Sequence, residues 1–528
     1  MATTSGKSGK CSNFGNCTLA DARQSIEVPL GLDFVCTECA KTLVATGPAA
    51  VSSSMKNLAV MGGVLLAAGA IAWFLVAGKA TGSGVTAATL GVPSVAATAD
   101  PKVGVLLKIA GSNTLGSQLV PALAEAFLKS QGATVTKRVP GASPVEVSVQ
   151  AQMPDGSTQS ISIAAHGSST AFDGLLQSTA DIGMSSRRVS PTEAGKLAVL
   201  GDMTSLASEH VVGLDGLAVI VHKSNPVASL TKDQLARIFT GASGDWSQLA
   251  NAAKGKTGPI ALYARDEKSG TYDSFKHMVL DPGSLAASAK RIEDSGQLSE
   301  AVANDPSAIG FIGLPYVRNA RALSVGDKGA VALLPNRFTV ATEDYVLSRR
   351  LYLYSASAPS NPNVMKFIEF AKSGNGQAIV SQQGFIEQTV RAQDDASKTG
   401  ASAADQPAEY QRATANATRL SLNFRFRSGS RDLDNKAIPD LDRVVTFLAD
   451  MRTPPGSVML FGFADARGTA DGNLKLSRER AQTVASEFTA RGIAPALVNG
   501  FGAALPVASN DTPDGQEKNR RVEIWIKR

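Results

Sequence analysis

The stretch GLAVIVHKSNPVASLTKDQLARIF, residues 216–239, indicates the secondary structure in the middle of this chain. Its first half is a short apolar run, which is typical of a buried strand, and a turn containing Pro226 follows. LTKDQLARIF, residues 230–239, then places apolar residues at helical spacing. The stretch therefore predicts a strand that leads through a turn into a helix.

The same alternation recurs on both sides of this stretch. VGVLLKIAG (103–111) precedes the helical pattern QLVPALAEAFLKS (118–130), and AIGFIGL (308–314) is a later apolar strand. Alternating strands and helices predict an α/β architecture, in which ligands bind at the C-terminal ends of the strands.

Four loops of this region are rich in small and hydroxyl-bearing residues, and each precedes a helical pattern. They are AGSNTLGSQ (110–118), AHGSSTAFDG (165–174), DIGMSSRRVS (181–190) and RDEKSGTYDSF (265–275). The start of a helix carries free N–H donors and a partial positive charge, so these loops indicate a cradle for an oxyanion. The alternative for any one loop is an ordinary Ser or Thr N-cap.

The motifs IAGSNT, ADIGMSSR, DGLAVIVHKSNPVASLTKDQLARIFTGASGDW, RDEKSGTYDSF and AIGFIGL occur in an order that resembles transporter-associated periplasmic phosphate-binding proteins. The resemblance covers residues 103–391 and implies two α/β lobes that are joined by crossing strands and close on phosphate. The second lobe is expected at about 214–334. The resemblance implies a binding protein rather than an enzyme, with an ABC transporter or a sensor as a partner.

The resemblance also implies the residues that hold the anion. Carried over position by position, they are Thr114, Leu115 through its backbone N–H, Ser168, Ser186, Arg265, Ser269, Gly270 and Thr271. Ser186 stands where well-known members have an aspartate, which accepts the proton of phosphate and repels sulfate. A hydroxyl repels sulfate weakly, so selectivity is left open, as is whether Arg187 is a ligand or a surface cation.

From residue 417 onward the pattern changes to an α+β domain that ends at residue 528. Its strand LSLNFRFRSGS (420–430) and helix NKAIPDLDRVVTFLADM (435–451) precede a D-x2-G-x4-N-x2-LS-x2-RA run at 465–481. This run resembles the peptidoglycan-binding domain of outer-membrane protein A and its relatives. The resemblance implies that Asp465 and Arg480 clamp the ammonium and carboxylate of diaminopimelate in the peptide stem. Three further residues match the motif and are expected to shape the pocket: Asn473, Asn519 and Arg520.

One uncharged segment, NLAVMGGVLLAAGAIAWFLVAG (57–78), predicts a transmembrane helix. At 1.5 Å per residue it spans about 33 Å, enough for the hydrocarbon core of a bilayer. Lysines and arginines are more frequent before it than just after it, so the N-terminus is expected in the cytoplasm. The protein is thus expected to pass once through the inner membrane, with most of the chain in the periplasm.

All four cysteines lie in the arm 1–52: Cys11, Cys17, Cys36 and Cys39. The C-x2-C pair and the looser C-x5-C pair predict a small zinc ribbon with one structural Zn²⁺, and the alternative is a set of free thiols. Segments 79–102 and 392–416 are rich in Ala, Ser and Thr and are expected to be flexible linkers.

The composition and the motifs favour binding over other functions. A net charge of +6 without a basic stripe gives no support for nucleic-acid binding, and neither HExxH nor GxSxG occurs. The sequence predicts a membrane-anchored periplasmic protein that captures phosphate or a similar oxyanion and attaches non-covalently to peptidoglycan. The alternative is a membrane-to-wall tether whose middle domain binds no small anion, or binds a protein partner.

Overall fold

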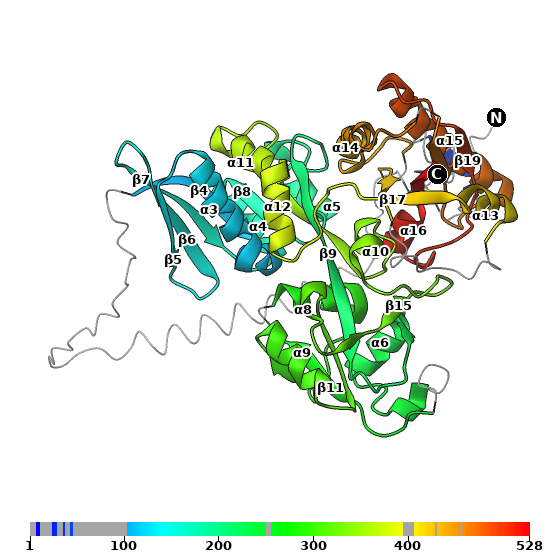
Figure 1. Ribbon diagram of the computed structural model, residues 1–528, viewed down its shortest axis with the longest axis horizontal. Helices are drawn as coiled ribbons and strands as arrows, with labels where there is room; N and C mark the ends of the chain where they lie inside the picture. The colour runs from blue at the N-terminus through cyan, green and yellow to red at the C-terminus, as the bar shows by residue number, and fades with distance from the viewer. Residues whose placement is uncertain are drawn as a thin grey trace, which may run out of the picture. The chain divides into compact units, whose positions relative to one another are not determined.

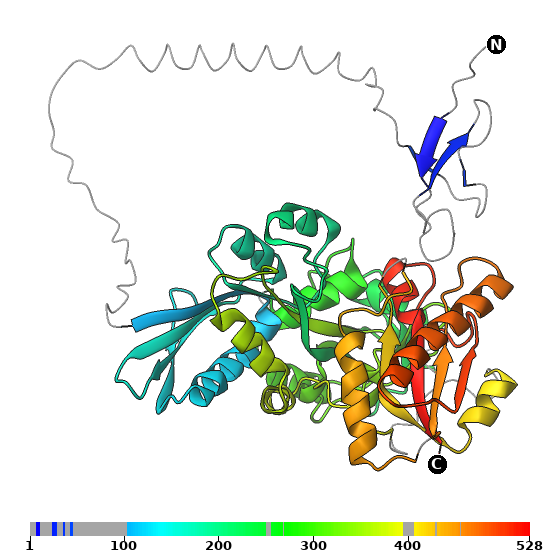
Figure 2. The same ribbon diagram turned by 90° about the horizontal axis from the view of Figure 1, so that it is seen from above.

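A computed structural model describes most of the chain from residue 103 onward and four short pieces before it. The described residues are 7–10, 24–28, 35–36, 43–45, 103–249, 255–267, 269–393, 406–427, 430–454 and 456–527. The chain divides into two compact units, residues 1–99 and 100–528. The first unit contains three short antiparallel strands, drawn in blue in Figure 2, in the order β2 (Ser25–Val28), β1 (Lys7–Lys10), β3 (Val44–Ala45).

Most of the predicted zinc ribbon and the whole predicted transmembrane segment lie outside the described residues. Of the four cysteines only Cys36 is described, and its side chain is buried. Among the residues that the structure describes, no helix has the length and apolar character needed to cross a bilayer, and no metal-holding group of His, Cys, Asp or Glu occurs. The zinc site at Cys11, Cys17, Cys36 and Cys39 and the helix at 57–78 therefore stay predictions.

The second unit contains the two α/β lobes that the sequence predicts. One eleven-stranded sheet runs through both lobes in the order β12-β11-β13-β9-β16-β8-β4-β7-β6-β5, with β14 paired to β9. The long strand β9 (Glu209–Val221) is buried along its whole length, and β16 (Ser348–Tyr354) pairs antiparallel with it. These two strands run between the lobes (Figure 1), so they are the crossing strands.

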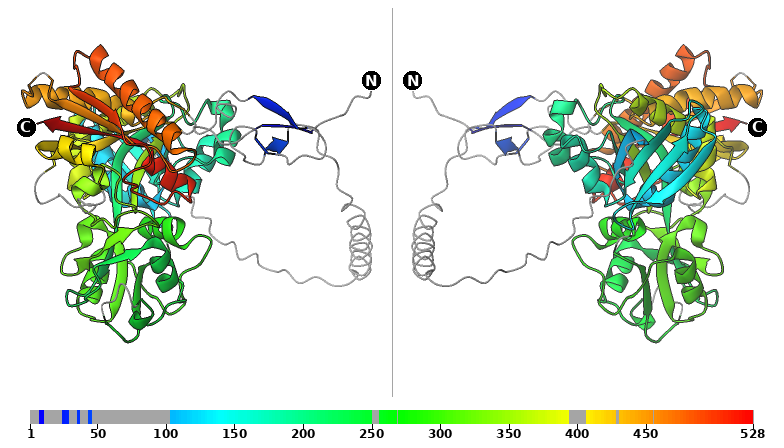
Figure 3. Two further views of the ribbon diagram at one scale, coloured as in Figure 1. Left: turned by 90° about the vertical axis from the view of Figure 1, so that its right-hand side faces the viewer. Right: turned by 90° about the vertical axis from the view of Figure 1, so that its left-hand side faces the viewer.

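The first lobe is built on strands from both ends of the binding region. Figure 3 shows its sheet in blue and cyan. Its strands are β4 (Val103–Gly111), β5 (Val135–Pro140), β6 (Glu146–Gln152), β7 (Thr158–Ala164) and β8 (Ile182–Ser185). Its helices are α3 (Val120–Ser130), α4 (Ser168–Leu176), α5 (Pro191–Lys196), α11 (Asn363–Lys372) and α12 (Gly374–Gln382).

The second lobe packs its helices on the other end of the sheet. Its strands are β10 (Ser229–Thr231), β11 (Ala261–Arg265), β12 (Lys290–Ile292), β13 (Ala308–Gly313), β14 (Arg321–Ala322) and β15 (Ser324–Gly326). Its helices are α6 (Lys232–Phe239), α8 (Gly270–Phe275) and α9 (Ser295–Ala303), and α10 (Arg337–Ala341) follows before β16. The pair β9 and α6 confirms the strand-to-helix prediction at 216–239.

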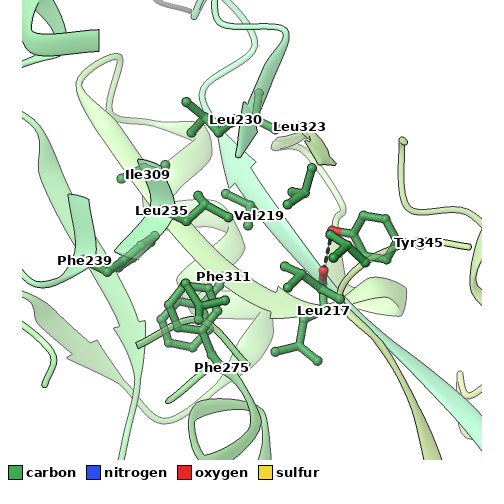
Figure 4. Close-up of a cluster of buried hydrophobic side chains, with 14 of the residues drawn as sticks. Leu217, Val219, Leu230, Leu235, Phe239, Phe275, Ile309, Phe311, Leu323 and Tyr345 are labelled. Carbon is green, nitrogen blue, oxygen red and sulfur yellow. Dashed lines mark hydrogen bonds between the residues drawn. The ribbon is translucent and has the colours of Figure 1, made fainter. Parts of the chain in front are cut away.

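The core of the second lobe holds α8 in place. Phe275, at the end of α8, stacks on Phe311 of β13 with ring centres 3.8 Å apart, and Phe239 meets both rings edge-on. Figure 4 shows this cluster, in which the Tyr345 hydroxyl also donates to the carbonyl of Leu217 at 2.7 Å. Because Phe275 is fully buried, the opposite end of this short helix is fixed in space.

The C-terminal region forms the predicted α+β domain. Its four-stranded sheet has the order β17 (Ala417–Arg425), β20 (Arg521–Lys527), β18 (Val458–Gly462), β19 (Leu497–Gly500). Its helices are α13 (Ala408–Thr414), α14 (Ala437–Asp450), α15 (Ala470–Ala490) and α16 (Pro513–Asn519).

Part of the segment 392–416, predicted as a flexible linker, is structured. Helix α13 lies within it, and its Tyr410 packs edge-on against four aromatic rings of the C-terminal domain. The Tyr410 hydroxyl donates to Glu523 at 2.8 Å. Composition alone missed this helix, because a single buried aromatic residue supplies its anchor.

Buried charged groups connect the C-terminal domain to the binding region. The Arg350 guanidinium pairs with Glu343 at 2.9 Å and with Asp434 of the C-terminal domain at 2.7 Å. Arg419 pairs with Asp344 at 2.8 Å, and the Lys518 ammonium donates to three backbone carbonyls between residues 345 and 348. The two regions therefore share one buried polar interface next to the crossing strand β16.

Candidate functional site

Two serines of the first lobe meet beyond the ends of β7 and β8, the strands on either side of β4. Ser168 is the first residue of α4, and Ser186 follows the last residue of β8. Their hydroxyl oxygens lie 3.3 Å apart, and the backbone N–H of Ser186 donates to the Ser168 hydroxyl at 3.2 Å. Both were predicted as ligands of the anion, and the structure brings them together.

The second lobe presents the start of α8. Ser269 caps this helix, and its hydroxyl accepts from the N–H groups of Thr271 at 3.2 Å and Tyr272 at 3.4 Å. This is the N-cap geometry that the sequence offered as the plainer alternative. A single hydroxyl can accept and also donate, so Ser269 keeps its own proton for another acceptor.

Gly270 brings the two lobes into direct contact. A Cβ built on Gly270 would overlap the Thr114 hydroxyl oxygen and the Thr114 backbone nitrogen. Thr114 follows β4 at the start of the helical segment that includes Leu115, so this contact joins the first and fourth predicted loops. Only glycine allows the loops to approach this closely.

A cavity of about 440 Å³ lies where the lobes face each other. Ser168 of the first lobe and Ser269 of the second lobe both line it. The other described residues that line it are Asn113, Ser143, Val145, Ala165, His166, Gly167, Ser169, Arg187, Glu267 and Asp273. Of the predicted ligands, the described lining includes only these two serines. It does not include Thr114, Leu115, Ser186, Arg265, Gly270 or Thr271.

The charges that line the cavity are mixed. Among the described lining residues, Arg187 is a cation and Glu267 and Asp273 are carboxylates. His166 also lines the cavity and bonds to Glu146 at 2.8 Å. Sequence reasoning singled out neither Glu267 nor Asp273, although both belong to the quoted stretch 265–275. These carboxylates lie in the same cavity as Ser168 and Ser269, whereas Ser186 supplies a hydroxyl where well-known members of the resembled family have an aspartate.

Arg187 is held by its own lobe. Its guanidinium makes a bidentate pair with Glu193 at 2.7 and 2.8 Å and lies over the ring of Phe172. Burial opposes ionisation of Glu193, but hydrogen bonds from Arg187 and Ser190 lower its pKa to about 2. Arg187 thus lines the cavity as a cation whose charge is already paired.

Arg265, the predicted cation of the site, ends β11. Its guanidinium donates to the hydroxyl of Ser295 and lies 3.7 Å from a carboxylate oxygen of Asp266. Burial lowers the pKa of Arg265 below its ordinary value, and its buried Nε has no hydrogen-bond partner among the described residues. Arg265 therefore has one N–H donor, at Nε, without a described partner, at the C-terminal end of β11.

A buried pair that no motif singled out lies between the loops. Arg349 of β16 pairs with Asp215 of β9 at 2.6 Å, and both side chains are buried. Its guanidinium also donates to the Thr114 hydroxyl at 3.0 Å and to the Gly270 carbonyl at 3.2 Å. The one signal in the sequence is a pair of arginines inside the otherwise apolar strand SRRLYLY, residues 348–354.

In the C-terminal domain the predicted peptidoglycan residues are all buried. Asp465 pairs with Arg520 at 2.9 Å and also accepts from the N–H of Arg467 at 3.0 Å. Arg480 projects from α15 over the ring of Phe426, and Asn473 lies two turns earlier on the same helix. The structure brings Asp465 together with Arg520. Asn519 has a structural role, since its side chain accepts from two backbone N–H groups at residues 507 and 508.

Several known proteins are similar to the binding region of this chain. Phosphate-binding protein PstS of Pseudomonas aeruginosa is 30% identical over 239 residues, which cover 43% of this chain and 73% of that protein. PstS of Borreliella burgdorferi is 27% identical over 229 residues, covering 42% of this chain and 77% of that protein. The crystal structure of an ABC-type phosphate transport receptor from Vibrio cholerae is 24% identical, with a TM-score of 0.41, and covers 53% of this chain and 99% of that chain.

Two family matches account for most of the second unit. Residues 425–520 match the OmpA family. Residues 77–375, more than half of the chain, match the PBP superfamily domain. This chain therefore belongs to the PBP superfamily and carries an OmpA-family domain behind its binding-protein domain.

Proposed function

We propose that the binding-protein domain captures phosphate or a similar oxyanion in the cavity between its lobes. The observation that carries this proposal is that Ser168 and Ser269, each at the start of a helix and each from a different lobe, line one cavity. Helix starts supply N–H donors and partial positive charge to an anion. The relatives named above are phosphate-binding proteins by name, which supports the same ligand class.

The remaining ligands in this proposal come from the loops beside the cavity. Thr114 and the Leu115 N–H act from the first lobe with Ser186, and Gly270 and Thr271 act from the start of α8. Arg265 supplies the cation, and its unpartnered Nε supports this role, because a guanidinium can donate in a fork to two phosphate oxygens. Asp273 or Glu267 accepts the proton that phosphate retains near neutral pH.

The C-terminal domain, in the same proposal, attaches to peptidoglycan without cleaving it. Asp465 pairs with the ammonium and Arg480 with the carboxylate of diaminopimelate in the peptide stem. Asn473 and Arg520 shape the pocket. Arg520 forms an ion pair with Asp465 in the structure, so a ligand ammonium would share Asp465 with Arg520 or replace Arg520. The match to the OmpA family supports this assignment.

The proposed location is the inner membrane. Residues 57–78 would span it once, with the N-terminal arm in the cytoplasm and its four cysteines on a structural zinc. The captured anion would then be delivered to an ABC transporter or read by a sensor in the same membrane. Peptidoglycan attachment would hold the receptor between the membrane and the wall.

The test of anion capture is calorimetry on the full-length chain with inorganic phosphate. We expect heat of binding for the native protein and none for Arg265→Ala, with Arg237→Ala on the exposed face of α6 as the control. Full length is needed because the C-terminal domain covers buried charges of the binding domain. Absence of heat with phosphate, arsenate and sulfate would overturn the proposal.

Wall attachment is tested separately by retention on insoluble peptidoglycan. Asp465→Asn should lower retention severalfold, whereas Asp471→Asn, in the exposed first turn of α15, should not. Equal retention of Asp465→Asn and the native chain would contradict the clamp.

A second candidate function is a tether between membrane and wall whose middle domain binds no small anion. The two carboxylates in the cavity favour it, because Glu267 and Asp273 repel a dianion while Arg187 is already neutralised by Glu193. Retention on peptidoglycan without any oxyanion binding is the result that selects this candidate.

A further inference from the structure

One guanidinium touches both lobes at the point where they meet. Arg349 donates from Nη2 to the Thr114 hydroxyl and from Nη1 to the Gly270 carbonyl. Thr114 belongs to the first lobe and Gly270 begins α8 of the second lobe. Neither neighbour is close in sequence, since Thr114 lies 235 positions and Gly270 lies 79 positions from Arg349.

The arginine itself is fixed by the crossing strands. Arg349 stands directly opposite Asp215 in the register of β16 and β9, and both its Nε and Nη2 donate to one carboxylate oxygen of Asp215, at 3.0 and 2.6 Å. Both residues are buried, so the pair is shielded from solvent. Asp215 neutralises the charge of Arg349, which leaves the directed hydrogen bonds as its contribution to the site.

Those hydrogen bonds decide what Thr114 can do. A hydroxyl has one proton, and the Thr114 oxygen already accepts from Arg349. The proton of Thr114 is then available to donate to a third group, and an oxyanion beside the loop is such an acceptor. The bond to the Gly270 carbonyl similarly fixes the first peptide group of α8, whose following N–H belongs to Thr271.

We propose that Arg349 is a positioning residue of the anion site: it holds the two lobes together by bonding Thr114 and Gly270 at once, and it aims the Thr114 hydroxyl at the bound oxyanion. This inference rests on the proposed function for its ligand and adds a residue that no loop motif contains. It acts through Thr114 and α8 rather than by touching the anion.

The first test is a double-mutant cycle read by calorimetry with inorganic phosphate on the full-length chain. Lysine keeps the positive charge but cannot reach three acceptors with a rigid fork, so Arg349→Lys should weaken binding roughly tenfold or more. In a Thr114→Val background the same change should have a much smaller effect. Arg321→Lys is the control. Arg321 also donates to two backbone carbonyls, but these belong to Asn225 and Val227 and not to the loops that contain Thr114 and Gly270.

A loss in Arg349→Lys that is equally large in the Thr114→Val background would overturn the positioning role, as would an unchanged Kd. Thermal unfolding separates these outcomes from misfolding. If Arg349→Lys unfolds, Asp215→Asn takes its place in the cycle. It leaves the guanidinium present but loosens its anchor, so it should give a smaller loss of affinity that again depends on Thr114.

The second test needs no ligand and separates this inference from the proposed function. Amide hydrogen exchange of segments 112–116 and 269–273 reports the contact between the lobes. Arg349→Lys should speed exchange in both segments several-fold, and Arg321→Lys in neither. If the native chain binds no oxyanion but exchange rises as expected, the proposed function fails and the lobe contact through Arg349 stands. Unchanged exchange in both segments overturns the inference.

Discussion

Arg349 and Arg350 are neighbours on β16, and their side chains serve opposite sides of the crossing strand. Arg349 donates to Thr114 of the first lobe and Gly270 of the second, and Arg350 pairs with Asp434 of the C-terminal domain at 2.7 Å. Successive side chains of a strand point to opposite faces, so one short strand can serve both. The contact between the two lobes and the docking of the C-terminal domain therefore share a single strand, β16.

Breaking the ion pair between Arg350 and Asp434 should destabilise the second unit. Asp434→Asn removes a buried charge from the Arg350 guanidinium and leaves it with Glu343 alone, so we expect a loss of about 3 kcal/mol in the free energy of unfolding. Denaturant unfolding of the full-length chain measures this. Asp442→Asn is the matched control, because Asp442 pairs with Arg491 at 2.8 Å on the exposed surface and should change stability by less than about 0.5 kcal/mol. Equal effects of the two changes would contradict a buried, stabilising interface.

Adding one methyl group at Gly270 should separate the lobes. Gly270→Ala places a Cβ into Thr114, so the lobes cannot close fully. The affinity for phosphate should fall roughly tenfold or more, while the fold of each lobe persists. Calorimetry gives the Kd and thermal unfolding checks the fold. Gly195→Ala is the control, since a Cβ there meets nothing within 4 Å in α5. A native Kd in Gly270→Ala would mean that the contact between the loops is not needed for binding.

The cavity carboxylate Asp273 should set selectivity among oxyanions. A carboxylate accepts the proton of phosphate but repels sulfate, which has no proton to donate near neutral pH. Asp273→Asn should therefore reduce the preference for phosphate over sulfate about tenfold, measured as the ratio of the two Kd values. Asp155→Asn, in an exposed turn between β6 and β7, is the control. If the ratio does not change, Asp273 does not meet the anion.

Stability should fall below pH 6.5 because of His210. Burial first, and the cation of Lys372 second, lower the pKa of His210 from 6.5 to about 4. Between pH 6.5 and pH 4 the unfolded chain binds a proton at His210 and the folded chain does not. The free energy of unfolding therefore falls as the pH drops through this range. The full loss from this one group is roughly 3 kcal/mol.

His210→Gln should remove that part of the pH dependence. Denaturant unfolding at pH 7 and pH 5 gives the slope for each chain, and carboxylates common to both cancel in the comparison. His222→Gln, just after the same strand, is the matched control for the loss of an imidazole. Identical slopes for His210→Gln and the native chain would show that His210 is not a buried neutral imidazole.

Much of the fold could be predicted from local pattern. The alternation at 216–239 became β9 and α6, and Ser168 and Ser269 stand at helix starts as their loops indicated. These features depend on residues within a few turns of one another, where apolar spacing and capping chemistry act. Helix α13 was missed because its anchor, Tyr410, gains stability from rings in strands and loops up to 115 positions away in the chain.

Local sequence pattern was enough to predict the α/β architecture of the binding region, the α+β domain behind it and the hydroxyl-bearing helix starts, because periodicity and caps depend on nearby residues. The division into two lobes came from the family resemblance. Tertiary packing is what joins Arg349 to Thr114, Asp215 and Gly270. It also places Asp273 in one cavity with Ser168 and pairs Arg350 with Asp434. A guanidinium in an apolar strand can be paired with any distant carboxylate or carbonyl. The packing of the whole unit selects the partner, because a buried charge is stable only where its partners converge.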